Sequence, residues 1–257
     1  MNILCVGDVT SPAGVEHLRA NLWQFRRDNK IDFCVVNGEN ASLVSAATPE
    51  QAETLLKSGA DAVTGGNHTL RQKLIYRMLE ENDALLRPIN FPEGAPGVGY
   101  NIFDVNGYRV LLINAMGNVH IDPTLDSPYP YIDRVLSREE GRYDIALIEI
   151  HAEATGEKVA LGYAYDGKVS AVWGTHTHVP TADEQILPLG TGYITDIGMC
   201  GESGGVLGMD PALVVERMRT RLPIRFQKAV GRVIASGVIF TIDEKTRKTT
   251  SVRRVSF

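Results

Sequence analysis

Short apolar runs alternate with amphipathic stretches over the first third of the chain. The stretch 14–29 places its apolar side chains at helical spacing, at Val15, Leu18, Leu22 and Phe25. The stretch 48–58 begins with Thr48, Pro49 and Gln51, which predict a capping box with proline in the first turn of a helix. An apolar run that predicts a strand precedes each expected helix: 2–8 before 14–29, 32–40 before 48–58, and 61–66 before 73–82. This order predicts an α/β fold.

The second half of the chain mixes further strands and helices with hairpins. Asn106-Gly107 divides the apolar segment 100–117 and predicts a two-residue hairpin turn. Later strands are expected at 143–150, 168–174, 235–243 and 249–257, a hairpin-like pair at 183–199, and helices at 152–165 and 211–220. The segment 118–131 is rich in proline and aspartate and is interpreted as a functional or packing loop. We therefore expect a single domain, 1–257, in which two mixed β-sheets pack together between flanking helices.

Composition narrows the classes of protein and partner. The 257 residues carry a formal net charge of −5, which argues against a long nucleic acid as partner but allows small phosphorylated ligands. No apolar run reaches the roughly 18 residues of a membrane helix, and the chain enters its first strand without a signal peptide, so a cytoplasmic protein is expected. The composition is also compatible with a homo-oligomer. Three cysteines without a Cys-x-x-Cys pair are interpreted as buried thiols: Cys5, Cys34 and Cys200.

The polar residues that end the predicted strands share one kind of chemistry. In open α/β sheets, ligands bind beyond the carboxyl ends of the strands, so these positions indicate a site. All of them carry oxygen or imidazole donors: Asp8 after the first strand, Glu39 and Asn40 after the second, Asn67 and His68 after the third, and His151, His176 and His178 after two later strands. His176 and His178 lie two positions apart, which places both side chains on one side if the segment is extended.

Each donor taken alone also has an ordinary structural explanation. Asp8 fits an N-cap or turn, Glu39 a solvated carboxylate, Asn40 and Asn67 turn residues, and His151 a hydrogen-bonded strand end. Donors at five strand ends together favour a metal site. The set contains carboxylate, carboxamide and imidazole groups but no thiolate, which favours iron, manganese or zinc. About seven donors are too many for one four-coordinate ion, so two metal ions that share the Glu39 carboxylate are expected.

His68 is interpreted differently from the other donors. It follows Asn67 directly, and adjacent loop residues seldom reach the same ion, so its imidazole is expected to transfer a proton beside the metal centre. A further metal ligand or a turn residue is the alternative for His68. His17 and His120 lie away from the strand ends and are excluded from the expected site. Two aspartates could orient a ligating imidazole or form turns, and they stay outside the expected set: Asp183 and Asp196.

Several of these residues fall into motifs of a known superfamily. The pair Gly7-Asp8, the triplet 66–68, the lone His151 and the His-x-His of 176–178 resemble the calcineurin-like metallophosphoesterases. Longer phrases are similar to the YmdB-like bacterial phosphodiesterases: NGENA at 37–41, GADAVTGGNH at 59–68, RPINFPEGAPG at 87–97, HAEATGEK at 151–158, GTHTHVPTAD at 174–183 and YITDIGMCG at 193–201. The similarity continues through LGMD at 207–210 and LPIRF at 222–226, so it covers most of the chain.

The resemblance implies a metallophosphoesterase-type sandwich with a dinuclear centre, iron being the metal in the best-known setting. The implied ligands are Asp8, Glu39, Asn40 and His178 for one ion, and Glu39, Asn67, His151 and His176 for the other. His68 corresponds to the family's proton donor, and a hydroxide formed from bridging water is expected to attack phosphorus. The implied activity is hydrolysis of small phosphodiesters, with 2′,3′-cyclic nucleotides as the substrate class.

Two departures and two rival functions accompany the resemblance. Many calcineurin-like enzymes have Asp-x-His after the first strand, whereas this chain has Thr10, and Asn40 looks like the substitute donor. The loop after Asp8 also lacks a glycine expected in YmdB-like relatives, which bears on substrate fit.

A regulator that binds a cyclic nucleotide or a protein partner without turnover is the alternative function, but such regulators usually lose ligands. A metallo-β-lactamase-type hydrolase is excluded because Pro180 and Thr181 stand where its motif needs Asp and His.

Overall fold

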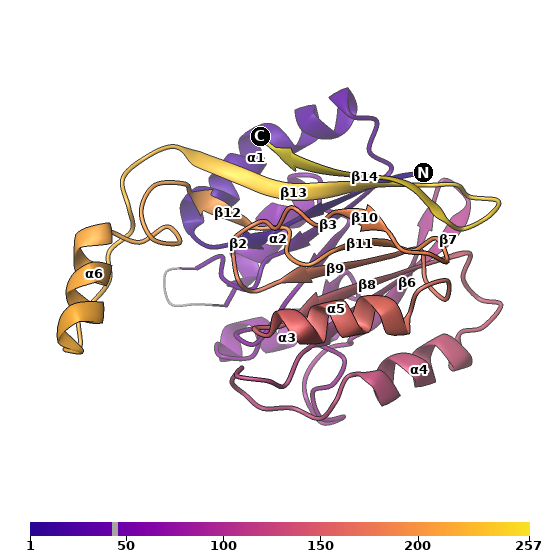
Figure 1. The fold of residues 1–257 in the computed structure, drawn as a ribbon, viewed down its shortest axis with the longest axis horizontal. Coiled ribbons are helices and arrows are strands. Elements are labelled where there is room, and N and C mark those ends of the chain that lie inside the picture. Colours follow the sequence, from indigo (N-terminus) through magenta and orange to yellow (C-terminus); the bar gives the residue numbers. More distant parts are fainter. Residues whose placement is uncertain (43–45) are drawn as a thin grey trace.

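Two β-sheets lie face to face with helices on both outer faces in the computed structural model, which describes residues 1–42 and 46–257 (Figure 1). The strand order of the larger sheet is β2 (Asp8–Val9), β12 (Met199–Glu202), β13 (Val233–Ile242), β1 (Asn2–Val6), β3 (Phe33–Asn37), β4 (Ala62–Thr64) and β5 (Leu85–Leu86), and β14 (Thr249–Ser256) pairs with β13. The order of the smaller sheet is β10 (Gln185–Ile186), β11 (Gly192–Ile194), β9 (Ala171–Thr175), β8 (Ile145–His151), β7 (Tyr108–Met116) and β6 (Tyr100–Val105).

In chain order the helices are α1 (Pro12–Asp28), α2 (Pro49–Lys57), the short 3-10 helix η1 (Lys73–Ile75), α3 (Tyr76–Glu81), α4 (Tyr129–Arg138), α5 (Thr155–Ala164) and α6 (Pro211–Thr220). Helices α1 and α2 cover the outer face of the larger sheet, and α4 and α5 cover that of the smaller sheet. No helix within the described ranges is both long enough and apolar enough to cross a bilayer. The three cysteines are buried and free, as the sequence predicts.

Both sheets combine parallel and antiparallel pairs. In the larger sheet β1, β3, β4 and β5 run parallel, and β13 is antiparallel to β1. In the smaller sheet β7, β8 and β9 run parallel, and β6 is antiparallel to β7. The expected class, two mixed sheets flanked by helices, is therefore confirmed. Since parallel strands end at the same edge of a sheet, the polar residues that follow them are collected at that edge.

Apolar side chains fill three layers. The first lies between the larger sheet and α1 and α2, and it includes Leu18 and Leu55. The second lies between the two sheets, where Trp173 of β9 packs near Phe240 of β13 with ring centroids 6.1 Å apart. The third lies between the smaller sheet and α4 and α5, and it includes Ile132. The middle layer fixes the distance between the sheets and so the distance between their strand ends.

Local sequence signals correspond to the observed elements in most places. The capping box at α2 is present, since the Thr48 hydroxyl accepts from Gln51 N at 3.3 Å and the Gln51 side chain accepts from Thr48 N at 3.0 Å. The turn between β6 and β7 uses Asn106 and Gly107, both with positive φ. Helix α6 has the predicted bounds.

The prediction of a loop over the whole of 118–131 is wrong at its end. Helix α4 begins at Tyr129 and was not expected from the sequence. Pro130 lies in its first turn, where a backbone N–H is not needed for helical hydrogen bonds. The proline content that predicts a loop is therefore compatible with a helix start at this point.

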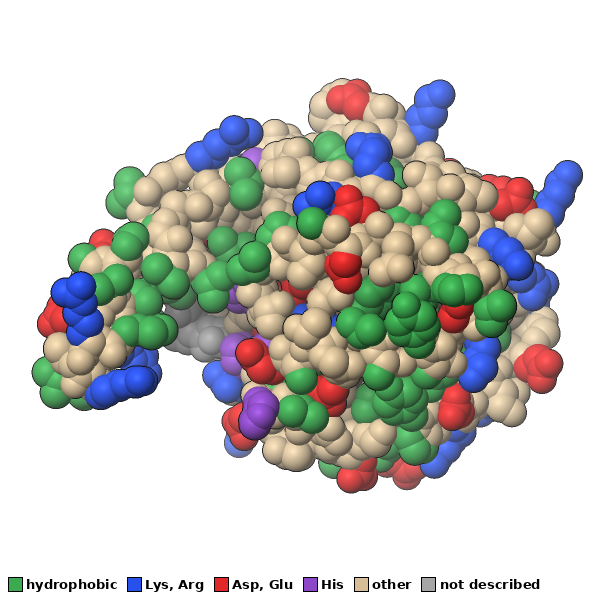
Figure 2. All heavy atoms as spheres, viewed as in Figure 1, with side chains coloured by type: hydrophobic (Ala, Val, Ile, Leu, Met, Phe, Trp, Pro, Cys, Tyr) green, Lys and Arg blue, Asp and Glu red, His purple; other side chains and the backbone are tan. Residues whose placement is uncertain are grey.

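Helix α6 extends away from the two sheets (Figure 1). Val214 is its buried residue, and most of its other side chains are exposed. Figure 2 shows the surface hollowed between this projection and the body of the molecule, with histidine side chains at the margin of the hollow.

Replacement of Trp173 by alanine tests the importance of the middle layer. Trp173 is fully buried, so Trp173→Ala should lower the free energy of unfolding by about 3–5 kcal/mol through lost burial and the remaining cavity. Urea unfolding followed by circular dichroism measures the loss. The control is Trp23→Ala, because Trp23 is 50% exposed and should cost less than half as much. Equal losses for the two variants would contradict this account of the core.

Candidate functional site

The polar residues that end the strands of both sheets gather at one place. The larger sheet and its loops supply Asp8, Glu39, Asn40, Asn67 and His68; the smaller sheet supplies His151 at the end of β8, and His176 and His178 after β9. Every one of these eight residues lies within hydrogen-bond or ion-pair distance of another. The contacts form two groups, Asp8 with His178 and the remaining six residues. The edges of the two sheets thus meet in a cluster of carboxylates and imidazoles.

Three atoms of the larger group lie close to the ring nitrogen Nε2 of His151. It lies 3.0 Å from His176 Nδ1, 3.1 Å from Asn67 Oδ1 and 3.4 Å from Glu39 Oε2. Glu39, His151 and His176 each offer a ligand atom, and these atoms lie within 4.8 Å of one another. Two ring nitrogens and two oxygens this close together are suitable ligands for a transition-metal cation.

Glu39 also connects this group to His68 through Asn40. Asn40 Nδ2 donates to Glu39 Oε1 at 2.6 Å, and Asn40 Oδ1 lies 2.6 Å from His68 Nδ1. The backbone N–H of His68 donates to Glu39 Oε2 at 3.1 Å. Because Asn40 uses its amino group on Glu39, its oxygen must accept from the Nδ1–H of His68. Far from being a solvated loop carboxylate, Glu39 is buried and bonded on both oxygens.

The second group is a buried carboxylate beside one imidazole. Asp8 is fully buried, and neither of its oxygens accepts a hydrogen bond from the described residues, although His178 Nε2 lies 3.2 Å from Oδ2. Burial opposes a charge on His178, but the Asp8 carboxylate and Glu39 outweigh burial and raise the pKa of His178. A buried carboxylate without hydrogen-bond donors is costly unless a cation balances it. The carboxylate of Asp8 and the imidazole of His178 are therefore suitable ligands for a cation.

The charges of the larger group are strongly coupled. Burial alone would raise the pKa of the Glu39 carboxyl, but His151 and His68 outweigh burial and hold this pKa well below its usual range. Burial opposes protonation of His151, yet Glu39 raises the pKa of His151 to about 9. Burial and the charge of His151 together lower the pKa of His176 to about 4. One positive charge at this point balances Glu39, and a metal cation can supply that charge in place of a proton.

The segment that carries His176 and His178 is not extended, so the condition under which both side chains would lie on one side is not met. The two residues have φ values of 94° and 64°, in the left-handed region that residues other than glycine rarely adopt. The turn directs the two imidazoles to different groups, His176 to His151 and His178 to Asp8.

A buried ion pair holds this turn. Asp196 accepts hydrogen bonds from the backbone N–H of Thr177 at 3.2 Å and from its hydroxyl at 2.6 Å. Lys158 pairs with Asp196 at 2.8 Å, and both side chains are buried. Asp183 instead bonds the hydroxyl of Thr195. Among the described residues, neither aspartate makes a hydrogen bond to an imidazole; Asp196 instead supports the turn through Thr177.

Sequence reasoning missed two glutamates that contact the site. Glu149 of β8 is fully buried, and burial raises its pKa to about 7, although donors around it favour the charged form. Its carboxylate accepts from Asn37, Thr64 and Thr175. Glu153 Oε2 lies 3.1 Å from His176 Nε2. The signal for Glu149 was available, because a charged residue inside the apolar run 145–151 needs buried partners.

The two excluded histidines lie outside the cluster. His17 is hydrogen-bonded to the carbonyl oxygen of Phe257 at 2.9 Å, and its ring packs beside the Phe257 ring. His120 is exposed in the loop before α4. The surroundings of both histidines thus agree with their exclusion.

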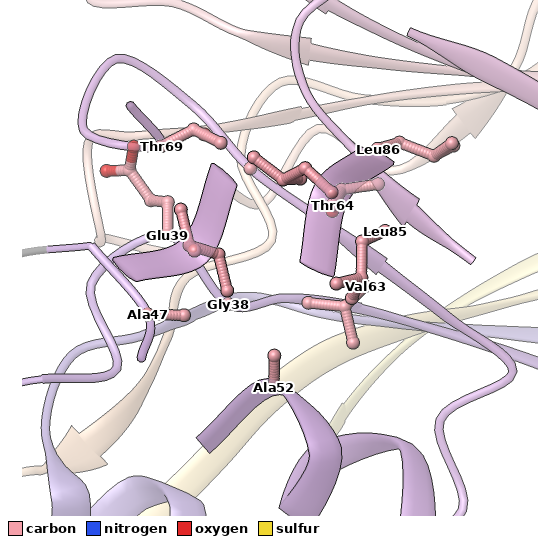
Figure 3. Close-up of a pocket in the computed structure, with 12 residues that line it drawn as sticks. Gly38, Glu39, Ala47, Ala52, Val63, Thr64, Thr69, Leu85 and Leu86 are labelled. Carbon is pink, nitrogen blue, oxygen red and sulfur yellow. The ribbon is translucent and has the colours of Figure 1, made fainter. Parts of the chain in front are cut away.

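The cavity behind Glu39 is too small for a substrate. Its volume is about 30 Å³, room for about one water molecule, and most of its lining is apolar, including Ala52, Val63 and Leu85. Figure 3 shows the Glu39 carboxylate pointing away from Ala52 and Val63. A substrate must therefore approach the cluster from the other side of Glu39.

The sequence is similar to those of known proteins over nearly its whole length. A family model described as "YmdB-like protein" matches residues 4–255. A protein of Bacillus subtilis (strain 168) named "2′,3′-cyclic-nucleotide 2′-phosphodiesterase" is 42% identical over 255 residues, which cover 99% of this chain and 96% of that protein. The match agrees with the resemblance found in the motifs.

Solved structures share the fold. A hypothetical protein from Thermus thermophilus has a TM-score of 0.91 and 35% identity, and the match covers 100% of this chain and 99% of that chain. A structure described as a novel phosphatase from Mycoplasma pneumoniae also has a TM-score of 0.91, with 30% identity and coverage of 100% and 93%. The expected fold type, that of the metallophosphoesterases, is confirmed.

Gly66 provides a direct test of the cluster. A Cβ at this position would lie 2.3 Å from both Glu39 Oε2 and His151 Nε2, so Gly66→Ala must displace those groups. We expect the variant to bind metal at least about 10-fold more weakly, the scale of a disturbed ligand environment. Titration with zinc against a chromogenic chelator measures the change. Gly94→Ala is the control, because a Cβ at Gly94 meets nothing within 4 Å. Wild-type affinity in Gly66→Ala would contradict the placement of the site.

Proposed function

This chain belongs to the YmdB-like family, and we propose that it hydrolyses small phosphodiesters, above all 2′,3′-cyclic nucleotides, at a centre of two metal ions. The relatives support the broader class, a phosphoric diester hydrolase: one is named as a cyclic-nucleotide phosphodiesterase and another is described as a phosphatase. The substrate class comes from the relative with 42% identity. The net charge of −5 agrees with a small substrate in place of a long nucleic acid.

One observation carries the proposal. Asn67 Oδ1, His176 Nδ1 and Glu39 Oε2 all converge on His151 Nε2. Two ring nitrogens 3.0 Å apart can share only one proton, whereas a cation between them would be bound by both lone pairs. The second supporting feature is Asp8, whose buried oxygens lack donors among the described residues.

The proposed ligand sets divide the cluster between two ions. Asp8, Glu39, Asn40 and His178 would hold one, and Glu39, Asn67, His151 and His176 would hold the other. Glu39 would contribute to both sets, because its Oε1 lies 2.6 Å from Asn40 Nδ2 and its Oε2 lies 3.4 Å from His151 Nε2. The mixture of oxygen and imidazole donors suits iron, with manganese or zinc as alternatives. When bound, such a pair supplies Lewis acidity and lowers the pKa of water.

His68 is proposed as the proton donor to the ribose oxygen that leaves phosphorus. Asn40 occupies its Nδ1–H, which leaves Nε2 as the nitrogen that can exchange a proton with a substrate. The His68 side chain is 19% exposed, so a substrate can reach it, whereas His151 is fully buried. His68 Nδ1 and Glu39 Oε1 lie 3.4 Å apart.

Replacement of His68 tests the proton-transfer role. His68→Ala should keep its metal and lose about 10²- to 10⁴-fold in turnover, the usual size of a general acid contribution. Steady-state kinetics on 2′,3′-cyclic AMP, with elemental analysis of the same sample, measures both properties. His17→Ala serves as the control because His17 contacts Phe257, outside the cluster. Unchanged turnover in His68→Ala would remove His68 from the mechanism.

The proposed function as a whole is tested by metal content and hydrolysis together. Protein purified without chelators should contain about two metal ions per chain and should hydrolyse bis-p-nitrophenyl phosphate and 2′,3′-cyclic AMP. Glu39→Ala should lose metal and activity, since it removes the bridging carboxylate. Two metals without turnover would contradict the hydrolase and favour a binding protein. Absence of metal would contradict the proposed centre.

A further inference from the structure

A line of hydrogen bonds runs from Glu149 to the ring of His151 on the side away from the cluster. The hydroxyl of Thr175 donates to Glu149 Oε1 at 3.0 Å, and the same hydroxyl oxygen lies 3.0 Å from His151 Nδ1. All three side chains are fully buried. The two nitrogens of His151 therefore have separate surroundings, Nδ1 beside Thr175 and Nε2 within the strand-end cluster.

The direction of these hydrogen bonds follows from counting protons. Asn37 Oδ1 accepts from the backbone N–H of Glu39, so the amino group of Asn37 must be the end that donates to Glu149 Oε1, at 2.6 Å. A threonine hydroxyl has one proton, and Thr175 gives it to the same Oε1. The Thr175 oxygen can then only accept from His151, so the proton of a neutral His151 is on Nδ1.

The direction holds in both protonation states of Glu149. A proton on this carboxyl would occupy Oε2, because Oε1 already accepts two hydrogen bonds. Oε2 faces the hydroxyl of Thr64 at 2.7 Å, and Thr64 has a second acceptor in the carbonyl oxygen of Val36 at 3.5 Å. Oε1 remains an acceptor throughout, so Thr175 continues to accept from His151.

We propose that Glu149 is a positioning residue which, through Thr175, fixes the proton of His151 on Nδ1 and presents the lone pair of Nε2 to the metal. This role rests on the proposed metal centre. Metal-binding histidines commonly donate their other ring N–H to a carboxylate or another acceptor, which fixes the orientation of the ring. In this protein the acceptor is a threonine hydroxyl whose own proton is held by a buried carboxylate.

Two pairs of variants separate hydrogen-bond direction from other effects. Thr175→Val removes the hydroxyl with little change in shape, and Thr175→Ser retains it. Glu149→Leu removes the acceptor. Glu149→Gln retains an acceptor oxygen in the place of Oε1, while its amino group can donate to Thr64, which then donates to Val36. Thr175→Val is the milder change and keeps the test available if Glu149→Leu fails to fold.

Zinc is the probe, because it is diamagnetic and suits these donors. Titration against a chelator should give affinities about 10- to 100-fold weaker for Thr175→Val and Glu149→Leu, and close to wild type for Thr175→Ser and Glu149→Gln. Nitrogen-resolved NMR of the zinc-loaded wild-type protein should find zinc on Nε2 of His151 and a slowly exchanging proton on Nδ1. That proton should exchange faster in Thr175→Val.

Glu139→Gln is the matched control for a buried glutamate. Glu139 is 3% exposed but bonds Tyr100, Arg138 and Arg142, none of which belongs to the cluster. Its zinc affinity should equal that of the wild type. Urea unfolding of every variant identifies a purely structural effect, which would lower stability without changing zinc affinity.

The remaining outcomes overturn either this role or its premise. Zinc affinity that is equal in Thr175→Val and wild type refutes the role of the hydroxyl. A large loss in Glu149→Gln means that the charge of Glu149 acts instead of its hydrogen-bond direction, which also refutes the proposal. Zinc bound through Nδ1 of His151 refutes it directly. A wild-type protein that binds no zinc refutes the metal centre itself, so the two failures are distinguishable.

Discussion

The site depends on the hydrogen bonds that the buried carboxylate of Glu149 accepts. Its oxygens accept hydrogen bonds from Asn37 and Thr64 of the larger sheet and from Thr175 of the smaller one. A buried carboxylate is costly unless such donors satisfy it, so the donors are constrained to remain around it. Their positions fix the ends of β3, β4 and β9 relative to β8. The strand-end donors follow within a few residues, and their convergence on His151 is a consequence of this tie between the sheets.

A second constraint acts on the loop after β9. The left-handed backbone at His176 and His178 is unfavourable for residues other than glycine, and it persists because the surrounding structure determines it. Thr177 is bound through its backbone and its hydroxyl to Asp196, whose charge is paired with Lys158. Unlike a surface pair, this ion pair lies in the interior, where removing one partner would leave an uncompensated charge. The backbone strain and the ion pair therefore belong to one arrangement that aims two imidazoles in different directions.

Much of this arrangement could be predicted from the sequence, because the end of a strand is a local feature and its polar residues stand out after an apolar run. The sequence could not show which residues from distant parts of the chain contact one another in the fold. Glu149 depends on Asn37, 112 residues away, and on Thr175, 26 residues away, so its role appears only when the sheets are assembled. The turn at His176 and His178 could not be predicted for a related reason: it is held by side chains from α5 and from the loop after β11. Metal identity and the ligand sets stay predictions.

The position of β13 has a consequence for the order in which the protein matures. This strand comes near the end of the chain but lies between β1 and β12, and β12 in turn pairs with β2, where Met199 faces Asp8. Ribosomal synthesis delivers the N-terminal strands first, together with Asp8 and Glu39. Asp8 has no imidazole partner until His178 has emerged, and the sheet that holds Asp8 closes only when β13 is inserted. Such distant pairings are slow to form, so the larger sheet and the surroundings of Asp8 are completed late.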